Sequence, residues 1–173
     1  MDNEIIGKLK NKDKEAFEIV MDKYKNSIYN YLYSILGDID LAEELTQETF
    51  VRVYFKAKHL KTDNLRSWIY KIATNLARSE FRKQKIRRFM PIHDMKNEKE
   101  ISVNYDNIDK ISIEELLKKI PEKYRTPLVM KELENFTYEE ISKILKKPIG
   151  TVKSLIFRGK DMLKEIVKGV KNE

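Results

Sequence analysis

The chain carries Lys153, Ser154 and Arg158 within six residues near its C-terminus, with Phe157 between the last two. Lysine and arginine neutralise phosphates and can pair with guanine edges, while serine hydrogen-bonds to bases or phosphates. An aromatic ring in such a place can pack on a thymine methyl group or on a sugar. These residue types, at this spacing, predict recognition of nucleic acid.

A helix that begins near Ile149 is expected to position these side chains. Its buried stripe would consist of residues at spacings of four, three and four: Val152, Ile156, Gly159 and Leu163. A shorter amphipathic helix precedes it, opened at Thr137 by a T-x-x-E capping box. We expect Pro148 and Gly150 to end the first helix and to free the backbone for the second. The pair predicts a helix-turn-helix, whose second helix enters the major groove.

A second candidate face lies on a long helical pattern that ends near Arg88. Its apolar stripe consists of Leu65, Trp68, Ile69, Ile72 and Leu76. We therefore expect Trp68 in the core and not as a platform for base stacking. Another stripe lies roughly 120° round the helix, at about 100° per residue, and consists of Lys71, Asn75, Arg78, Arg82 and Lys85. This stripe fits a nucleic-acid backbone, with one amide for reading a base.

The rest of the chain reads as helices at regular apolar spacing, which predicts an all-α fold. The expected helices cover 13–36, 39–57, about 64–88, 113–120, 122–134, 138–146 and the chain from 149 onward. Asp38 is expected to cap the second helix, Thr62 or Asp63 the third, and Gly37 to end the first. Residues 89–110 lack a sustained period and contain Pro91, which is typical of a flexible linker. We therefore predict two small helical domains, 1–88 and 111–173.

Composition narrows the function classes. The 173 residues carry a formal charge of +7, which favours an anionic partner. There is no cysteine, and the two histidines lie outside any metal-ligand pattern, so no metal or cofactor is expected. Nucleotide-binding glycine loops and nucleophile elbows are missing, so we expect no catalysis. No apolar run approaches the roughly 18 to 20 residues of a membrane span, and the first residues are too charged for a signal peptide. These features favour a cytoplasmic protein without membrane insertion.

Three segments together resemble a known family. TYEEISKILKKPIGTVKSLIFRGKDML resembles the fourth conserved region of bacterial RNA polymerase sigma factors, in particular the extracytoplasmic-function (ECF) group of the sigma-70 family. AEELTQETFVRVY, residues 42–54, resembles the second region, and LRSWIYKIATNLARSEFRKQK, residues 65–85, resembles the segment that follows it. The resemblance covers about residues 15–167 in the family's order. It implies a promoter-specificity subunit that an anti-sigma factor holds inactive.

The resemblance also implies roles for residues. Core RNA polymerase would be bound, at the clamp coiled coil of its largest subunit, by Glu43, Glu44, Gln47, Glu48 and Phe50. The −10 promoter element would be held by the stripe at residues 71–85 and by a loop in which a non-template base is unstacked. That loop consists of His59, Leu60, Lys61, Thr62, Asp63 and Asn64. The −35 element would be read by Thr151, Lys153, Ser154, Phe157 and Arg158.

One position departs from the family, and other functions remain open. Leu155 stands where many relatives carry arginine, which removes one possible phosphate contact. A stand-alone helix-turn-helix regulator would bind duplex DNA without polymerase and would not need the acidic segment. A protein-interaction adaptor would leave the basic faces merely solvated. A nucleic-acid-processing enzyme is disfavoured because metal ligands are missing.

Overall fold

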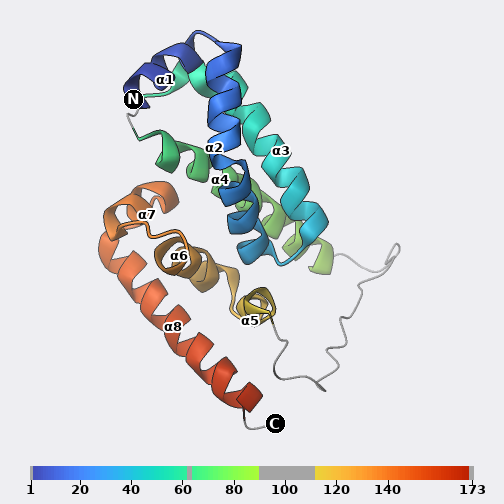
Figure 1. The fold of residues 1–173 in the computed structure, drawn as a ribbon. Coiled ribbons are helices and arrows are strands. Elements are labelled where there is room, and N and C mark those ends of the chain that lie inside the picture. The colour runs from blue at the N-terminus through green and yellow to red at the C-terminus, as the bar shows by residue number, and fades with distance from the viewer. Residues whose placement is uncertain (1, 62–63, 90–111, 172–173) are drawn as a thin grey trace.

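A computed structural model (Figure 1) describes residues 2–61, 64–89 and 112–171. Within these ranges the secondary structure is helical and no strand occurs, which confirms the all-α prediction. The elements are α1 (Asp2–Lys10), α2 (Lys14–Leu36), α3 (Ile39–Lys56), the 3-10 turn η1 (Ala57–His59), α4 (Leu65–Phe89), α5 (Ile113–Lys118), α6 (Glu122–Glu132), α7 (Tyr138–Leu145) and α8 (Ile149–Lys171).

Several helix ends form as their residue types predict. Asp13 caps α2 by accepting a hydrogen bond from the Ala16 amide at 2.8 Å. Gly37 ends the same helix with φ of 65°, a left-handed conformation that glycine adopts without steric cost. Asp38 then caps α3. A chain reversal this short places α3 antiparallel beside α2.

The cap of α4 differs from the prediction. Asn64 accepts the hydrogen bond from the Ser67 amide, at 2.9 Å. Three successive residues here have side chains that can cap a helix, so the sequence alone does not choose among them. Thr62 and Asp63 lie outside the described residues.

Helix α1 was not among the expected elements. Ile6 and Leu9 of this nine-residue helix are buried in the core, and the partly buried Ile5 packs against it. Three aliphatic positions in a segment this short produce too little periodicity to indicate a helix. Burial against α2 and η1 stabilises the helix, and that contact depends on the tertiary fold.

The N-terminal half, residues 2–61 and 64–89, is a bundle in which α2, α3 and α4 pack against one another (Figure 1). At its centre the Tyr31 hydroxyl and the Thr74 hydroxyl are hydrogen-bonded at 2.8 Å. Burial raises the pKa of Tyr31 well above its ordinary value, which keeps the phenol neutral. Trp68 is partly buried and packs against this core, as expected.

The C-terminal half, residues 112–171, holds the predicted helix-turn-helix in α7 and α8. Thr137 and Glu140 form the reciprocal capping box at the start of α7. Gly159 allows α8 to approach α6, because an added Cβ would lie 3.2 Å from the Tyr124 carbonyl oxygen. This close contact fixes the rotation of α8 about its axis, and hence which of its side chains face outward.

The turn between α7 and α8 is made differently from the prediction. Lys146 ends α7 in the left-handed conformation, with φ of 53°. Ser142 closes the turn by donating a hydrogen bond from its hydroxyl to the Lys147 carbonyl at 2.5 Å. Pro148 precedes α8, whereas Gly150 lies within its first turn. The predicted backbone role of Gly150 is therefore wrong, and Lys146 has it instead.

The two halves pack against each other over a continuous buried core. Figure 1 shows α5 and α6 beside the C-terminal part of α2, and α7 beside the start of α4. Arg125 joins them: its Nη1 donates to the Ile35 carbonyl at 2.6 Å, while its Nε donates to the Ile120 carbonyl at 3.0 Å. The predicted linker lies outside the described residues except for Phe89, so the domain limits stay predictions. No described helix is long and apolar enough to cross a membrane.

Candidate nucleic-acid and protein interfaces

The outward face of α8 displays every side chain predicted to read the −35 element. Val152 and Ile156 are buried and fix the helix on α6 and α7. The opposite side exposes Thr151, Lys153, Ser154, Phe157 and Arg158. Phe157 is 67% exposed, which is unusual for a phenylalanine and unexplained by packing within this chain. Leu155 is half-buried and packs against the core.

Two tyrosines outside α8 adjoin this face and were not predicted. The Lys153 ammonium lies 5.3 Å from the centre of the Tyr138 ring. The Lys123 ammonium lies 4.7 Å from the centre of the Tyr124 ring, and the cations of Lys123 and then Arg158 lower the pKa of this phenol. The basic face of α8 therefore continues onto α6 and α7. No local pattern could have shown this, because it depends on how the three helices pack.

The stripe predicted on α4 is present but less uniform. Asn75, Arg82 and Lys85 are exposed, whereas Lys71 and Arg78 are half-buried. The stripe runs along α4 from Lys71 to Lys85, and the last turn of the helix adds Arg87 and Arg88. Such a row can neutralise phosphates along a single groove or strand.

The loop before α4 is only partly exposed. His59 and Lys61 face solvent. Leu60 is 2% exposed and belongs to the core, so its predicted contact with DNA is wrong. Asn64 is exposed and donates from Nδ2 to Glu140 Oε1, at 3.1 Å. The structure thus brings the last residue of this loop against α7, a contact between the two halves that the sequence did not indicate.

A tightly packed cluster next to Asn64 was likewise not predicted. Arg66 Nη2 donates to the Glu134 backbone carbonyl at 2.6 Å, and its guanidinium lies 3.9 Å from the centre of the Phe136 ring. The Tyr70 hydroxyl donates to the Glu134 carboxylate. Burial, followed by this hydrogen bond, raises the pKa of Tyr70 above its ordinary range. The partners are more than 60 residues apart in sequence, so no spacing could have revealed them.

Helix α3 presents an acidic face, in contrast to the basic faces of α8 and α4. Glu43, Glu44 and Gln47 are exposed, and Glu48 is half-buried in an ion pair with Arg52 at 2.7 Å.

Phe50 is 4% exposed, so its predicted role as a surface contact is wrong. Helix α3 exposes three large apolar side chains, those of Ile39, Val51 and Phe55, the last 65% exposed. Val51 and Phe55 continue the stripe of Glu44 and Gln47 at spacings of four, a periodicity that could have been found in the sequence.

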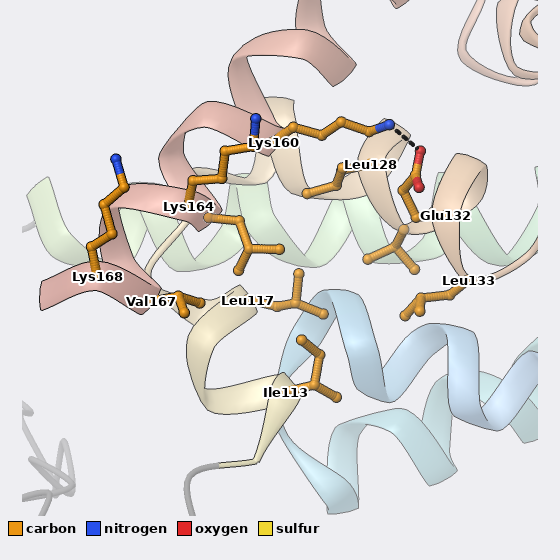
Figure 2. Close-up of a pocket in the computed structure, with 11 residues that line it drawn as sticks. Ile113, Leu117, Leu128, Glu132, Leu133, Lys160, Lys164, Val167 and Lys168 are labelled. Atoms are coloured by element: carbon orange, nitrogen blue, oxygen red, sulfur yellow. Dashed lines mark ion pairs between the residues drawn. The ribbon is translucent and has the colours of Figure 1, made fainter. Parts of the chain in front are cut away.

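An apolar groove lies between α5, α6 and α8 (Figure 2), with a volume of about 620 Å³. Its apolar lining consists of Ile113, Leu117, Leu128, Val129, Leu133, Leu163 and Val167. Lys164, Lys168 and the ion pair of Lys160 with Glu132, at 2.7 Å, form the rim. The groove offers no catalytic arrangement. Elsewhere in the described part of the chain, no three His, Asp or Glu side chains gather as a metal ion would require.

Comparisons with known proteins agree with this architecture. Residues 20–87 match the family model of sigma-70 region 2, and residues 110–163 match that of sigma-70 region 4. The ECF RNA polymerase sigma factor SigW of Bacillus subtilis is 31% identical over 92% of this chain and 93% of its own length. The RNA polymerase sigma-H factor of Pseudomonas aeruginosa is 25% identical over 99% of this chain and 96% of its own.

Two solved structures share the fold. CnrH, in complex with the cytosolic domain of CnrY, superposes with a TM-score of 0.74 over 97% of each chain at 15% identity. The sigma factor RpoE of Bartonella quintana, in complex with the anti-sigma factor NepR, gives 0.68 over 88% of this chain and 96% of its own at 21% identity. With both regions matched in order and a relative of 31% identity along nearly the whole chain, this protein belongs to the ECF group of RNA polymerase sigma factors, which direct RNA polymerase in transcription initiation.

Proposed function

We propose that this sigma factor binds core RNA polymerase through α3, reads the −10 element with α4 and the loop before it, and reads the −35 element with α8. The observation that carries the proposal is the exposed face of α8, where basic, hydroxyl and aromatic side chains stand opposite a buried stripe. In a helix-turn-helix this is the face that enters the major groove.

The chemistry of α8 suits base reading. Lys153 and Arg158 can pair with guanine or neutralise phosphates, and Ser154 can donate to either. Phe157 supplies an apolar surface for a thymine methyl group. The rotation of α8 is fixed by Val152, Ile156 and Gly159, so these groups are held in place before DNA arrives.

The chemistry of α3 suits a protein partner. Carboxylates at Glu43 and Glu44 repel a polyanion, which argues against DNA on this face. Val51 and Phe55 provide an apolar anchor beside them, the arrangement typical of an interface whose centre is apolar and whose edge is charged. The family resemblance supports the clamp coiled coil of the polymerase as the partner of this face, and a basic, partly apolar coiled coil would complement it.

The two most exposed phenylalanines on these helices provide a matched comparison. Phe55 is 65% exposed on the acidic face of α3, and Phe157 is 67% exposed on the basic face of α8. Neither belongs to the core, so replacing either should leave the fold intact. Phe55→Ala should weaken binding to core polymerase, whereas Phe157→Ala should weaken use of the −35 element only.

We place catalysis on the polymerase and this chain in the cytoplasm, where the polymerase acts. One solved neighbour, RpoE, is bound to the anti-sigma factor NepR, and another, CnrH, is bound to the cytosolic domain of CnrY. We propose a regulator of the same kind for this chain. A stand-alone regulator would have no use for the exposed acidic and apolar stripe of α3.

The test is transcription in vitro. Purified protein is mixed with core RNA polymerase and genomic DNA of the same organism, and the 5′ ends of the transcripts are sequenced. We expect start sites that share two sequence blocks, centred about 10 and 35 base pairs upstream, and that are absent with core alone. A protein that neither co-elutes with core nor produces such start sites would contradict the proposal.

A further inference from the structure

The start of α4 is covered by two carboxylates from the C-terminal half. Glu134 accepts a hydrogen bond from the Tyr70 hydroxyl and lies 3.5 Å from Arg66 Nη2. Its side chain is only 14% exposed, so it is enclosed by this contact. The Phe136 ring, which is fully buried, packs edge-on against Tyr70 at 4.9 Å between ring centres.

Glu140 makes the second contact. Its Oε1 accepts from Asn64 Nδ2 at 3.1 Å and lies 3.5 Å from the Ser67 hydroxyl. Its Oε2 accepts from the Thr137 amide at 2.9 Å as part of the capping box. The Glu140 carboxylate therefore both completes the capping box of α7 and contacts the start of α4.

The four groups so engaged are all hydrogen-bond donors: an amide, a guanidinium and two hydroxyls, from Asn64, Arg66, Ser67 and Tyr70. They lie within two turns at the start of α4, next to the loop expected to hold an unstacked base. Such donors are suited to phosphate oxygens and to acceptor atoms of bases. In the compact form, carboxylate oxygens of Glu134 and Glu140 contact these donors instead.

We propose that Glu134 and Glu140 are an internal mimic of nucleic acid that keeps the free protein in a compact, autoinhibited form. This inference rests on the proposed function and adds a regulatory contact to it. Binding of a DNA strand at the start of α4 and closure of the two halves compete for the same donors. Each must therefore weaken the other by the same factor.

Distance along the promoter independently requires the contact to open. The −10 and −35 elements are about 85 Å apart on B-form DNA, at about 3.4 Å per base pair. In the compact form Asn64 contacts Glu140, and Thr151 follows only eleven residues later. Eleven residues span at most about 40 Å even when fully extended. The two reading surfaces can reach both elements only after α4 and α7 separate.

The test uses two dyes on the full chain. The sequence has no cysteine, so Lys25→Cys on α2 and Asp161→Cys on α8, both exposed, give two labelling sites. Energy transfer between the dyes reports closure, and anisotropy reports binding of a labelled single-stranded DNA of mixed sequence. The latch variant is Glu134→Gln with Glu140→Gln. Glutamine at position 140 can keep the capping box, while its amide cannot accept from Asn64 in the same pose.

We expect the latch variant to show lower energy transfer and about tenfold tighter binding of the single strand, as removal of a 90% closed population would produce. The strand should also lower energy transfer in the unaltered protein. Glu139→Gln, an exposed neighbour on α7, is the matched control and should change neither signal.

Equal energy transfer in the latch variant and the unaltered protein, or unchanged strand binding, would overturn the inference. The transcription assay distinguishes this failure from that of the proposed function. A variant that opens without any start-site-specific transcription would uphold the latch and contradict the function. A protein that transcribes from specific sites but does not open would do the reverse.

Discussion

The two regions expected to read DNA differ in whether their side chains are exposed or already engaged by contacts within the protein. On α8 the reading residues are all exposed, and the adjoining tyrosines extend the face. At the start of α4 the donors are engaged by Glu134 and Glu140 from the other half. On the α4 stripe predicted from periodicity, Asn75, Arg82 and Lys85 are exposed, so the contact between the halves covers only the start of this helix. Helical periodicity predicts which residues can face a partner, while contacts between the halves decide whether they are available.

The largest expected effect is a loss of stability at Arg125, which joins the two halves at a place away from α4. Arg125 is buried, and this burial lowers the pKa of its guanidinium. The guanidinium donates hydrogen bonds to the backbone carbonyls of Ile35, Lys118 and Ile120. Arg125→Met keeps similar volume but removes these donors. The free energy of unfolding should fall by about 3 kcal/mol in urea titrations, because buried carbonyls lose their partners.

Lys123→Met, at an exposed position on the same helix, should cost much less. If Arg125→Met lowered the free energy of unfolding by less than about 1 kcal/mol, the two halves would not be joined through Arg125, and the α4 contact would be the main one.

The next effect concerns the open face. Arg158→Ala should weaken recognition of the −35 element by about 1–3 kcal/mol, because one good base contact is lost. Binding to core polymerase should be unchanged. Promoter binding by the holoenzyme measures this, with Lys168→Ala on the same helix as the control. Normal transcription by Arg158→Ala from a promoter that depends on its −35 element would mean that α8 reads DNA through another face.

A smaller effect is expected on the stripe of α4. Arg78→Ala should reduce the slope of the logarithm of DNA affinity against the logarithm of salt concentration by about 1, because one phosphate contact is lost. Lys83→Ala, whose ammonium is paired with Glu80 at 3.4 Å, is the control. An unchanged slope in Arg78→Ala would remove this residue from the DNA-binding stripe.

Thr137→Ala should lower stability by about 1 kcal/mol, since the capping box of α7 is broken. Helix α7 supports α8 on one side and contacts α4 on the other, so both reading faces depend on it. Thermal unfolding measures the loss. Ser112→Ala removes the longer, 3.3 Å cap of α5 and should cost less. Equal losses in the two variants would mean that the reciprocal cap adds nothing.

The smallest effect is a pH dependence at Glu140. Burial acts to raise its pKa, but hydrogen bonds from Thr137 and Asn64, with the attraction of Arg66, lower it below the ordinary 4.5. Because the folded pKa is the lower one, the stabilisation is complete above about pH 4.5 and is lost as the pH falls through the lowered value. The melting temperatures of the unaltered protein and Glu140→Gln should therefore converge as the pH falls below about 4.5. A difference that is independent of pH would contradict this.

The features that could be predicted from the sequence are helix ends and helix faces, because these depend on residues close together in the chain. The caps at Asp38 and Thr137, the stop at Gly37 and the two faces of α8 all follow from local chemistry. Leu60 and Phe50 were assigned outward because the resemblance covers a segment and does not settle which side of it is buried.

The contacts between the halves could not be predicted. Arg66 and Glu134 are 68 residues apart, and Arg125 and Ile35 are 90 residues apart. Neither pair has a spacing that marks it. The sequence correctly predicts Glu140 as a capping residue, but it does not indicate the second role of this carboxylate, the contact with Asn64. Pairings of this kind arise only when the two halves are placed together.

The most direct test of the central claim maps both faces on one promoter. A photoreactive benzophenone amino acid replaces Phe157 on α8 in one holoenzyme and Asn75 on α4 in another, and the crosslinked bases are located. The account predicts crosslinks about 25 base pairs apart, with Phe157 at the −35 element and Asn75 at the −10 element. Crosslinks from both positions to the same stretch of DNA, or in the reverse order, would contradict it.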